Sequence, residues 1–187
     1  IDSGKTIILD MNGETLSIGF SDSSKNLIVN NGTLTITGDG TFDATEATSY
    51  KGFINNYGTL TVENGTFQIA DKAMTVHLRN QDGGKAVING GTFSGGATIV
   101  RSFEGSNTTI TGGSFTNSVY PAVDVNGETL ITGGIFTNTS CSRCDSQNWG
   151  YTVRSGVDND PDAKLTITPA SEGSVVVTGT QGALSAT

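Results

Sequence analysis

The sequence predicts an all-β fold, a right-handed parallel β-helix in which short strands stack as the coils of a solenoid. Five short phrases end in a phenylalanine, at Phe42, Phe67, Phe93, Phe115 and Phe136, and these rings are 25, 26, 22 and 21 residues apart. A repeat of this period is typical of one supersecondary unit stacked on copies of itself. The 26 glycines and only three prolines suit a chain that turns often and keeps its backbone amides for strand pairing.

The clearest strand of each period is a triplet that precedes the phenylalanine. Its first and third residues share one face because side chains alternate along a strand. The third residues form an expected inward column of Ile36, Val62, Ile88, Ile110 and Ile131. The middle residues, Thr35, Thr61, Val87, Thr109 and Leu130, are expected to point outward.

Two further strands complete each period. One carries the phenylalanine, and the other precedes the triplet, as in residues 27–29, 53–54, 75–78, 98–100, 122–125 and 151–153. Residues 6–9 and 15–18 are expected to form the first coil, and residues 164–168 and 174–177 a degenerate last coil. This gives roughly seven coils of three short strands. The variable turn lengths favour a right-handed helix over the hexapeptide-based left-handed form.

The five phenylalanines are expected to stack inside the helix as an aromatic ladder. Parallel pairing with the next coil satisfies the interior amides and places equivalent side chains above one another. Offset aromatic contacts add about 0.5–1.5 kcal/mol per pair beyond the burial of apolar area.

The chain is expected to form a single domain over residues 1–187. We interpret it as a fragment of a larger protein, because it begins at Ile1 and not at a methionine. Its net charge of −8 argues against a nucleic-acid partner, since phosphates are bound by basic faces. No apolar run is long enough to predict membrane insertion.

Three stretches carry a resemblance to a known family. They are GKTIILDMNGETL (Gly4 to Leu16), GTLTITGDGTF (Gly32 to Phe42) and GGTFSGG (Gly90 to Gly96). The chain resembles the pectate-lyase-like right-handed β-helix repeat domains of bacterial, often Gram-positive, surface proteins. This resemblance implies an extracellular location, one module among several, and adhesion or carbohydrate recognition.

Aromatic residues outside the ladder are the first candidate binding site. Tyr50, Tyr120, Trp149 and Tyr151 all fall between a phenylalanine strand and the first strand of the next coil. Equivalent loops lie along one edge of a β-helix, and a row of tyrosine and tryptophan rings there could stack on sugar rings. The alternative is that each ring shields the edge of the core.

Polar side chains of the first strand are the second candidate. The expected outward column is His77, Val100, Asp124 and Arg154, with Arg79 and Arg101 near its end. A glycosidase needs two facing carboxyl groups, and this column holds one acid, so the sequence favours a non-catalytic role. Asp124 and Arg154 are expected to form a surface ion pair, or to serve as polar partners of the aromatic row. His77, the single histidine, is expected at a solvated strand position.

Two loops have other candidate chemistry. Asp158, Asp160 and Asp162 could offer oxygen ligands to calcium, although a rigid Asx-rich turn at Pro161 is favoured and no other cofactor is expected. Cys141 and Cys144 lie in the loop insertion 137–150. In an exported protein they are expected to form a local disulfide.

The function expected from these observations is a non-catalytic extracellular binding or adhesion module. Its partner would be an extracellular glycan or a surface protein. A polysaccharide lyase or glycoside hydrolase of the β-helix class is the main alternative. A passive spacer is another, and outward threonines such as Thr35, Thr61 and Thr109 leave ice binding as a third. The sequence leaves the oligomeric state open.

Overall fold

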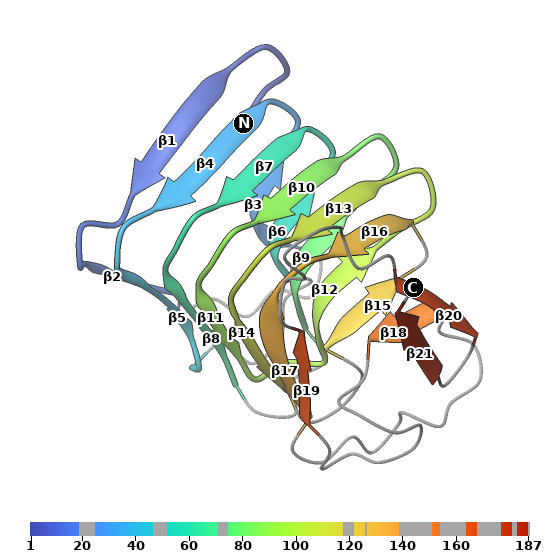
Figure 1. Ribbon diagram of the computed structural model, residues 1–187. Helices are drawn as coiled ribbons and strands as arrows, with labels where there is room; N and C mark the ends of the chain where they lie inside the picture. Colours follow the sequence, from blue (N-terminus) through green and yellow to red (C-terminus); the bar gives the residue numbers. More distant parts are fainter. Residues whose placement is uncertain are drawn as a thin grey trace.

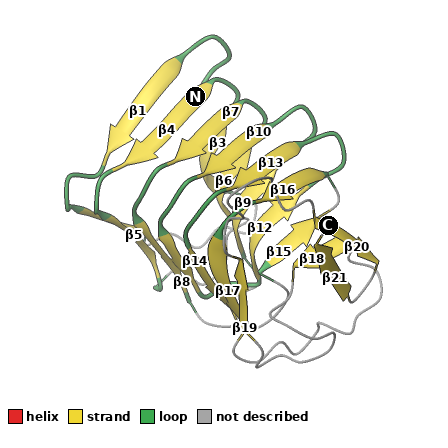
Figure 2. Ribbon diagram, viewed as in Figure 1, coloured by secondary structure: helices red, strands yellow, loops and turns green. Residues whose placement is uncertain are grey.

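The computed structural model is a parallel β-solenoid whose strands form three sheets (Figure 1). The structure describes residues 1–18, 25–46, 52–70, 75–117, 122–125, 127–138, 151–153, 164–167, 177–180 and 183–186. All regular secondary structure in these ranges is β-strand (Figure 2). Accordingly, the described residues include no helix that could cross a membrane.

Each coil contributes one strand to each sheet. Sheet A contains the triplet strands β1 (Thr6–Asp10), β4 (Thr33–Thr37), β7 (Thr59–Val62), β10 (Lys85–Ile88), β13 (Asn107–Ile110) and β16 (Glu128–Ile131). Sheet B contains the phenylalanine strands β2 (Thr15–Ser17), β5 (Thr41–Ala44), β8 (Thr66–Ile69), β11 (Thr92–Ser94), β14 (Ser114–Asn117) and β17 (Gly134–Asn138). Sheet C contains β3 (Asn26–Asn30), β6 (Gly52–Asn56), β9 (Val76–Asn80), β12 (Thr98–Ser102) and β15 (Val123–Val125).

The register of these strands confirms the predicted stacking. Equivalent residues pair across coils, as in Phe42↔Phe67 and Phe67↔Phe93 of sheet B. The expected inward column of sheet A is buried, with exposed fractions of 0–1% from Ile36 to Ile131. The middle residues of the same triplets are only partly buried, as an outward position requires.

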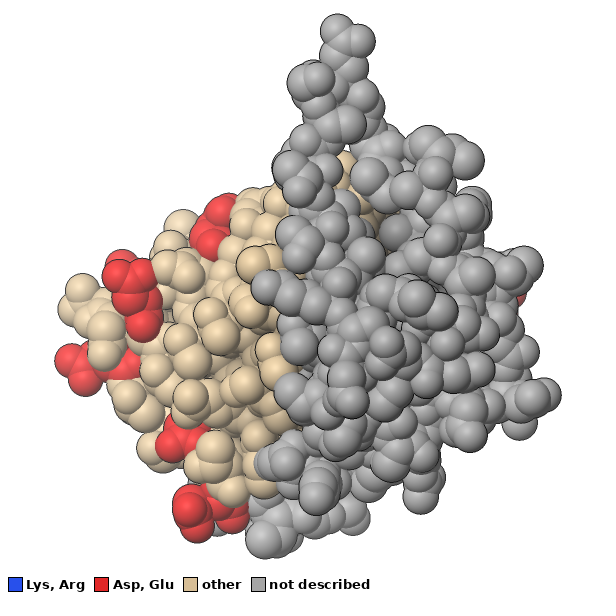
Figure 3. Space-filling model, turned by 60° about the horizontal axis from the view of Figure 1, so that its bottom comes forward, with Lys and Arg blue, Asp and Glu red and all other residues tan. Residues whose placement is uncertain are grey.

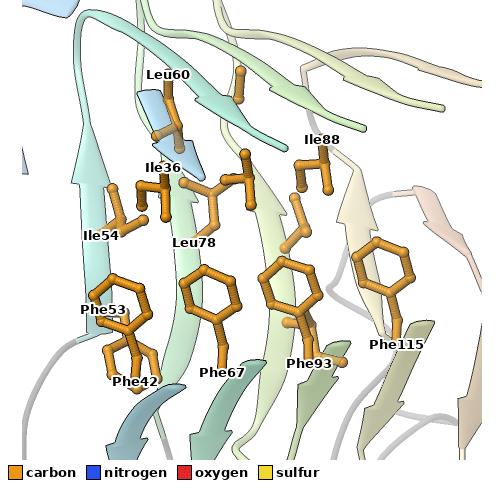
Figure 4. Packing of buried hydrophobic residues seen from close by; sticks show 14 of the residues in the cluster. Ile36, Phe42, Phe53, Ile54, Leu60, Phe67, Leu78, Ile88, Phe93 and Phe115 are labelled. Carbon is orange, nitrogen blue, oxygen red and sulfur yellow. The ribbon is translucent and has the colours of Figure 1, made fainter. Parts of the chain in front are cut away.

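The phenylalanines form the predicted ladder in the core (Figure 4). Ring centroids lie 4.8 Å apart between Phe42 and Phe67, 4.6 Å between Phe67 and Phe93, and 5.1 Å between Phe93 and Phe115. Neighbouring rings are within 6° of parallel. Phe136 pairs with Phe115 through the backbone, and its side chain lies outside the described part.

A second ladder, of buried asparagines, was not predicted. Asn30 donates from Nδ2 to Oδ1 of Asn56 over 2.7 Å, and Asn56 donates to Asn80 over 2.8 Å. Asn80 then donates to Thr108 Oγ1 over 2.9 Å. All three amides are fully buried at the turn that joins sheet C to sheet A. They satisfy one another and nearby carbonyls, which removes the cost of burying them.

The same turn requires glycine in successive coils. A Cβ at Gly58 would collide with the carbonyl oxygen of Gly32, and a Cβ at Gly32 would collide with that of Lys5. At these two positions the coil fits the backbone of the coil beneath it without room for one methyl group, whereas Ser106 occupies the equivalent position before β13.

The C-terminal part differs from the prediction. β18 (Tyr151–Val153) is antiparallel to β15, and β19 (Lys164–Ile167) is antiparallel to β17. β20 (Val177–Thr180) and β21 (Ala183–Ala186) pair with each other as an antiparallel sheet. The expectation that residues 151–153 and 164–168 continue the parallel columns is therefore wrong. Their alternation was compatible with either pairing direction, since both place side chains with a period of two.

Candidate ligand-binding face

The outer surface of sheet C carries a column of polar side chains that changes from coil to coil. Asn55, Arg79, Arg101 and Asp124 pair in sequence through the parallel register. They are preceded by Val29, which pairs with Asn55. We call this set of five residues the outer column. Its members lie one strand spacing apart, about 4.8 Å, so their side chains interact across coils.

Phe103 holds the two arginines of the outer column together. It follows β12 and is half-buried. The guanidinium carbons of Arg79 and Arg101 lie 5.1 and 5.2 Å from the centroid of its ring. Both distances are within the range of a cation–π contact. One aromatic ring therefore positions two positive charges on the same face.

The two arginines differ in how their charge is balanced. Arg101 Nε lies 3.0 Å from Asp124 Oδ2, and the carboxylate side chain is 1% exposed against 26% for the arginine. Arg79 forms no ion pair among the residues that the structure describes. Burial and the charge of Arg101 lower the pKa of Arg79, but an arginine remains protonated at neutral pH. The positive charge of Arg79 is therefore left without an opposite charge in the described part.

Neutral polar groups continue this face on the side of β6. Asn55 Oδ1 accepts a hydrogen bond of 2.6 Å from Gln81 Nε2, and Asn55 Nδ2 donates to the Tyr57 hydroxyl over 3.2 Å. Tyr57 is 46% exposed. The Tyr57 hydroxyl therefore lies beside Asn55, which is the register neighbour of Arg79. Tyr57, Arg79 and Phe103 thus form an aromatic–cationic surface.

The predicted outward column is corrected by this register. Val100 is fully buried, and His77 is 1% exposed, whereas Arg101 and Arg79 occupy the outward positions. The reason is local: Ile99 and Val100 are adjacent and both are fully buried, so simple alternation fails just before Arg101. Asp124 is outward in register, but it is buried and paired with Arg101. Arg154, its expected partner, lies outside the described residues.

His77 is part of the core and not of the site, contrary to the prediction of a solvated position. Its ring lies 5.5 Å from the Phe53 ring and 5.9 Å from the Phe93 ring, and Nε2 lies 3.2 Å from the carbonyl oxygen of Gly95. Burial lowers the pKa of His77 to about 4, and the carbonyl groups of Gly95 and Ser94 only partly oppose this effect. The histidine is therefore neutral at physiological pH.

Most of the other predicted site residues cannot be compared with this face. Tyr50, Tyr120 and Trp149 lie outside the described residues, and so do Asp158, Asp160, Asp162, Cys141 and Cys144. Only the backbone of Tyr151 is described, in β18. In the chain, Tyr50 and Tyr120 shortly precede β6 and β15, which are both strands of sheet C. Among the described residues, no group of three or more acidic, histidine or cysteine side chains could hold a metal ion.

Tyr57, Gln81 and Phe103 were missed by the sequence analysis. Each follows a strand of sheet C by one residue. That common offset was a usable signal, because residues directly after parallel strands lie at one edge of the sheet.

The charged groups of this protein are unevenly distributed. One side of the molecule shows several acidic side chains and, where residues are described, no lysine or arginine (Figure 3). The outer column provides two of the basic side chains in a chain with only ten lysines and arginines against 18 acids. Sheet C therefore offers cationic character that the bulk composition does not suggest.

Comparison with known proteins adds no further assignment: no family model, curated protein or solved structure matches the chain.

Proposed function

We propose that this chain is a non-catalytic extracellular binding or adhesion module and that the outer face of sheet C contacts its ligand, a carbohydrate or a cell-surface molecule. The supporting observation is the juxtaposition of Tyr57, Arg79 and Phe103 on one sheet face. Aromatic surface next to hydrogen-bonding groups suits sugar rings, which present apolar faces and hydroxyl edges. In the sequence, Tyr50 and Tyr120 shortly precede two strands of the same sheet, and the proposal includes them in the contact surface.

The proposal includes the finer architecture and origin expected from the sequence. We propose a right-handed helix of the pectate-lyase-like kind, from a bacterial surface protein. Supporting this are the three-sheet parallel stacking and the variable lengths of the segments that join sheet B to sheet C.

A binding role is favoured over hydrolysis by the state of Asp124. It is the acidic member of the outer column, and Arg101 engages its carboxylate at 3.0 Å. Glycoside hydrolysis requires two carboxyl groups across the scissile bond, one of them able to carry a proton. The outer column holds one acid, so it does not supply the second carboxyl group that this reaction needs.

A glycan array probed with the whole chain tests this proposal. We expect binding to a subset of glycans, and we expect Tyr57→Ala to weaken it by about tenfold, since a buried aromatic contact contributes about 1–2 kcal/mol. Trp149→Ala tests the loop contribution in the same way. Gln68→Ala, on the outer face of sheet B, is the matched control and should leave binding unchanged.

Two other outcomes would replace the proposal. Unsaturated products or new reducing ends on incubation with uronate polymers, with and without calcium, would identify a lyase or hydrolase. Absence of binding to every glycan and to intact cells would identify a spacer.

A further inference from the structure

We propose that the ligand of this face carries an anionic substituent, a carboxylate or a sulfate, and that Arg79 is the residue that binds it. This inference rests on the proposed function, because it assumes that the outer face of sheet C is the contact surface. It adds the chemical class of the ligand and a residue that determines specificity.

The first step is the asymmetry between the two arginines. They occupy equivalent positions in adjacent coils and share the Phe103 ring. Asp124 occupies the next position and neutralises Arg101. Within the described part of the chain, the position on the other side of Arg79 is filled by the uncharged Asn55. An anion placed beside Arg79 would give the pair of arginines a negative charge on each side, as Asp124 already does for Arg101.

The second step is the energetic consequence of this arrangement. Two guanidinium groups one strand spacing apart repel each other, and burial of Arg79 adds to that cost, as the lowered pKa of Arg79 indicates. A bound anion would offset both the repulsion between the two arginines and the cost of burying the charge of Arg79. The contact that holds Arg79 in place, with the Phe103 ring, is already present without ligand, so little side-chain entropy is lost on binding.

The third step concerns geometry. A guanidinium held against an aromatic ring keeps its N–H groups in its own plane, where they can donate two parallel hydrogen bonds to a carboxylate or sulfate. The Gln81 amide and the Tyr57 hydroxyl lie on the same face and provide neutral hydrogen-bonding groups for neighbouring hydroxyls. The net charge of −8 repels anions at long range. Binding of an anion would therefore depend on the short-range contacts of Arg79 and not on the net charge of the protein.

The experiment uses the whole chain and two matched pairs of polysaccharides. Hyaluronan is compared with its carboxyl-reduced form, and dextran sulfate with dextran. We expect at least one acidic member to bind about tenfold or more tighter than its neutral counterpart, as charge-assisted hydrogen bonds predict. The pair that shows this preference identifies the anionic group.

Two variants with the same change in net charge assign the effect. Arg79→Gln should abolish the preference for the acidic member, whereas Lys85→Gln, on sheet A, should leave it intact. Arg79→Lys should retain only part of it, because an ammonium cannot form the bidentate contact. Urea unfolding checks that each variant is folded.

The two proposals fail in different ways. Equal binding of acidic and neutral members, or a preference that survives Arg79→Gln, would overturn the inference and leave the proposed function standing. Failure to bind any of the four polymers, together with a silent glycan array, would overturn both.

Discussion

The phenylalanine ladder inside the solenoid and the outer column on sheet C run along the same coils, but the ladder repeats one residue type and the outer column does not. Inside, Phe42, Phe67, Phe93 and Phe115 repeat one residue type at one register position. Outside, the corresponding series runs Val29, Asn55, Arg79, Arg101 and Asp124, with a different character in nearly every coil.

This difference separates stacking from recognition. A ring that packs on its copy at 4.6–5.1 Å favours the same ring in every coil, because close packing tolerates little change in volume. The outer column does not stack identical rings inside the core, so a change of residue type there does not disturb that packing. In a repetitive fold, positions that escape the repeat on the outer surface are therefore the first place to seek a ligand.

Phe67→Ala is expected to have the largest effect on stability, and it tests whether the ladder positions are as constrained as the comparison implies. The ring lies between Phe42 and Phe93 and is 1% exposed. Its loss leaves a cavity in the middle of the ladder, and we expect the free energy of unfolding in urea to fall by about 3–5 kcal/mol. Gln68→Ala, one residue further on the outer side of the same strand, should change it by less than about 0.5 kcal/mol. Similar losses for the two variants would contradict the division between inside and outside.

His77 is an exception to the apolar core, because it is a titratable side chain that is 1% exposed. The pKa of His77 falls from 6.5 in an exposed histidine to about 4 in the folded protein, so below pH 6.5 the unfolded chain binds a proton that the folded chain excludes. Stability is therefore fully present above pH 6.5 and is lost as the pH falls from 6.5 to 4, by up to roughly 3 kcal/mol.

Chemical denaturation across this pH range measures the effect. Acidic side chains also titrate near its lower end, so the comparison is with His77→Gln, whose amide can still donate to the Gly95 carbonyl. The variant should lack the histidine-dependent part of the loss. Parallel pH profiles for the two proteins would show that His77 titrates normally.

The asparagine ladder predicts the smallest of the three effects. Asn56→Ala leaves the Nδ2 group of Asn30 and the Oδ1 atom of Asn80 without their side-chain partner in a buried turn. We expect a loss of about 1–3 kcal/mol in the free energy of unfolding. Asn64→Ala, which removes an exposed bond to Asp39, is the matched control and should be nearly neutral.

The architecture was accessible from the sequence because its signals are repetitive. Ile36 has an equivalent apolar residue at the same position of later coils, and so does Phe67. This recurrence, together with the alternation of side chains along a strand, predicts that both residues point inward. The direction of β18 and β19 was not accessible, since alternation within a strand is the same for parallel and antiparallel neighbours.

The candidate site was only partly accessible for a different reason. The outward phase of sheet C depends on the consecutive buried pair Ile99 and Val100, which breaks the alternation that the sequence analysis assumed. The sequence places Arg79 and Arg101 near the end of the column, whereas the register places them inside it, next to Asp124. Arg101 pairs with Asp124, and the expected partner Arg154 lies outside the described residues. The role of Phe103 depends on the strand register, because the register places Arg79 and Arg101 next to each other and against the same ring.

The turn glycines limit how such a protein can change in length. Gly58 rests on the backbone of Gly32, and Gly32 rests on that of Lys5, so a substitution in one coil is also felt by its neighbour. Insertion of a few residues into a strand would displace every contact beyond it. Duplication or deletion of an entire coil would keep the register of the remaining coils, so the chain can change in length by whole coils more readily than by single residues.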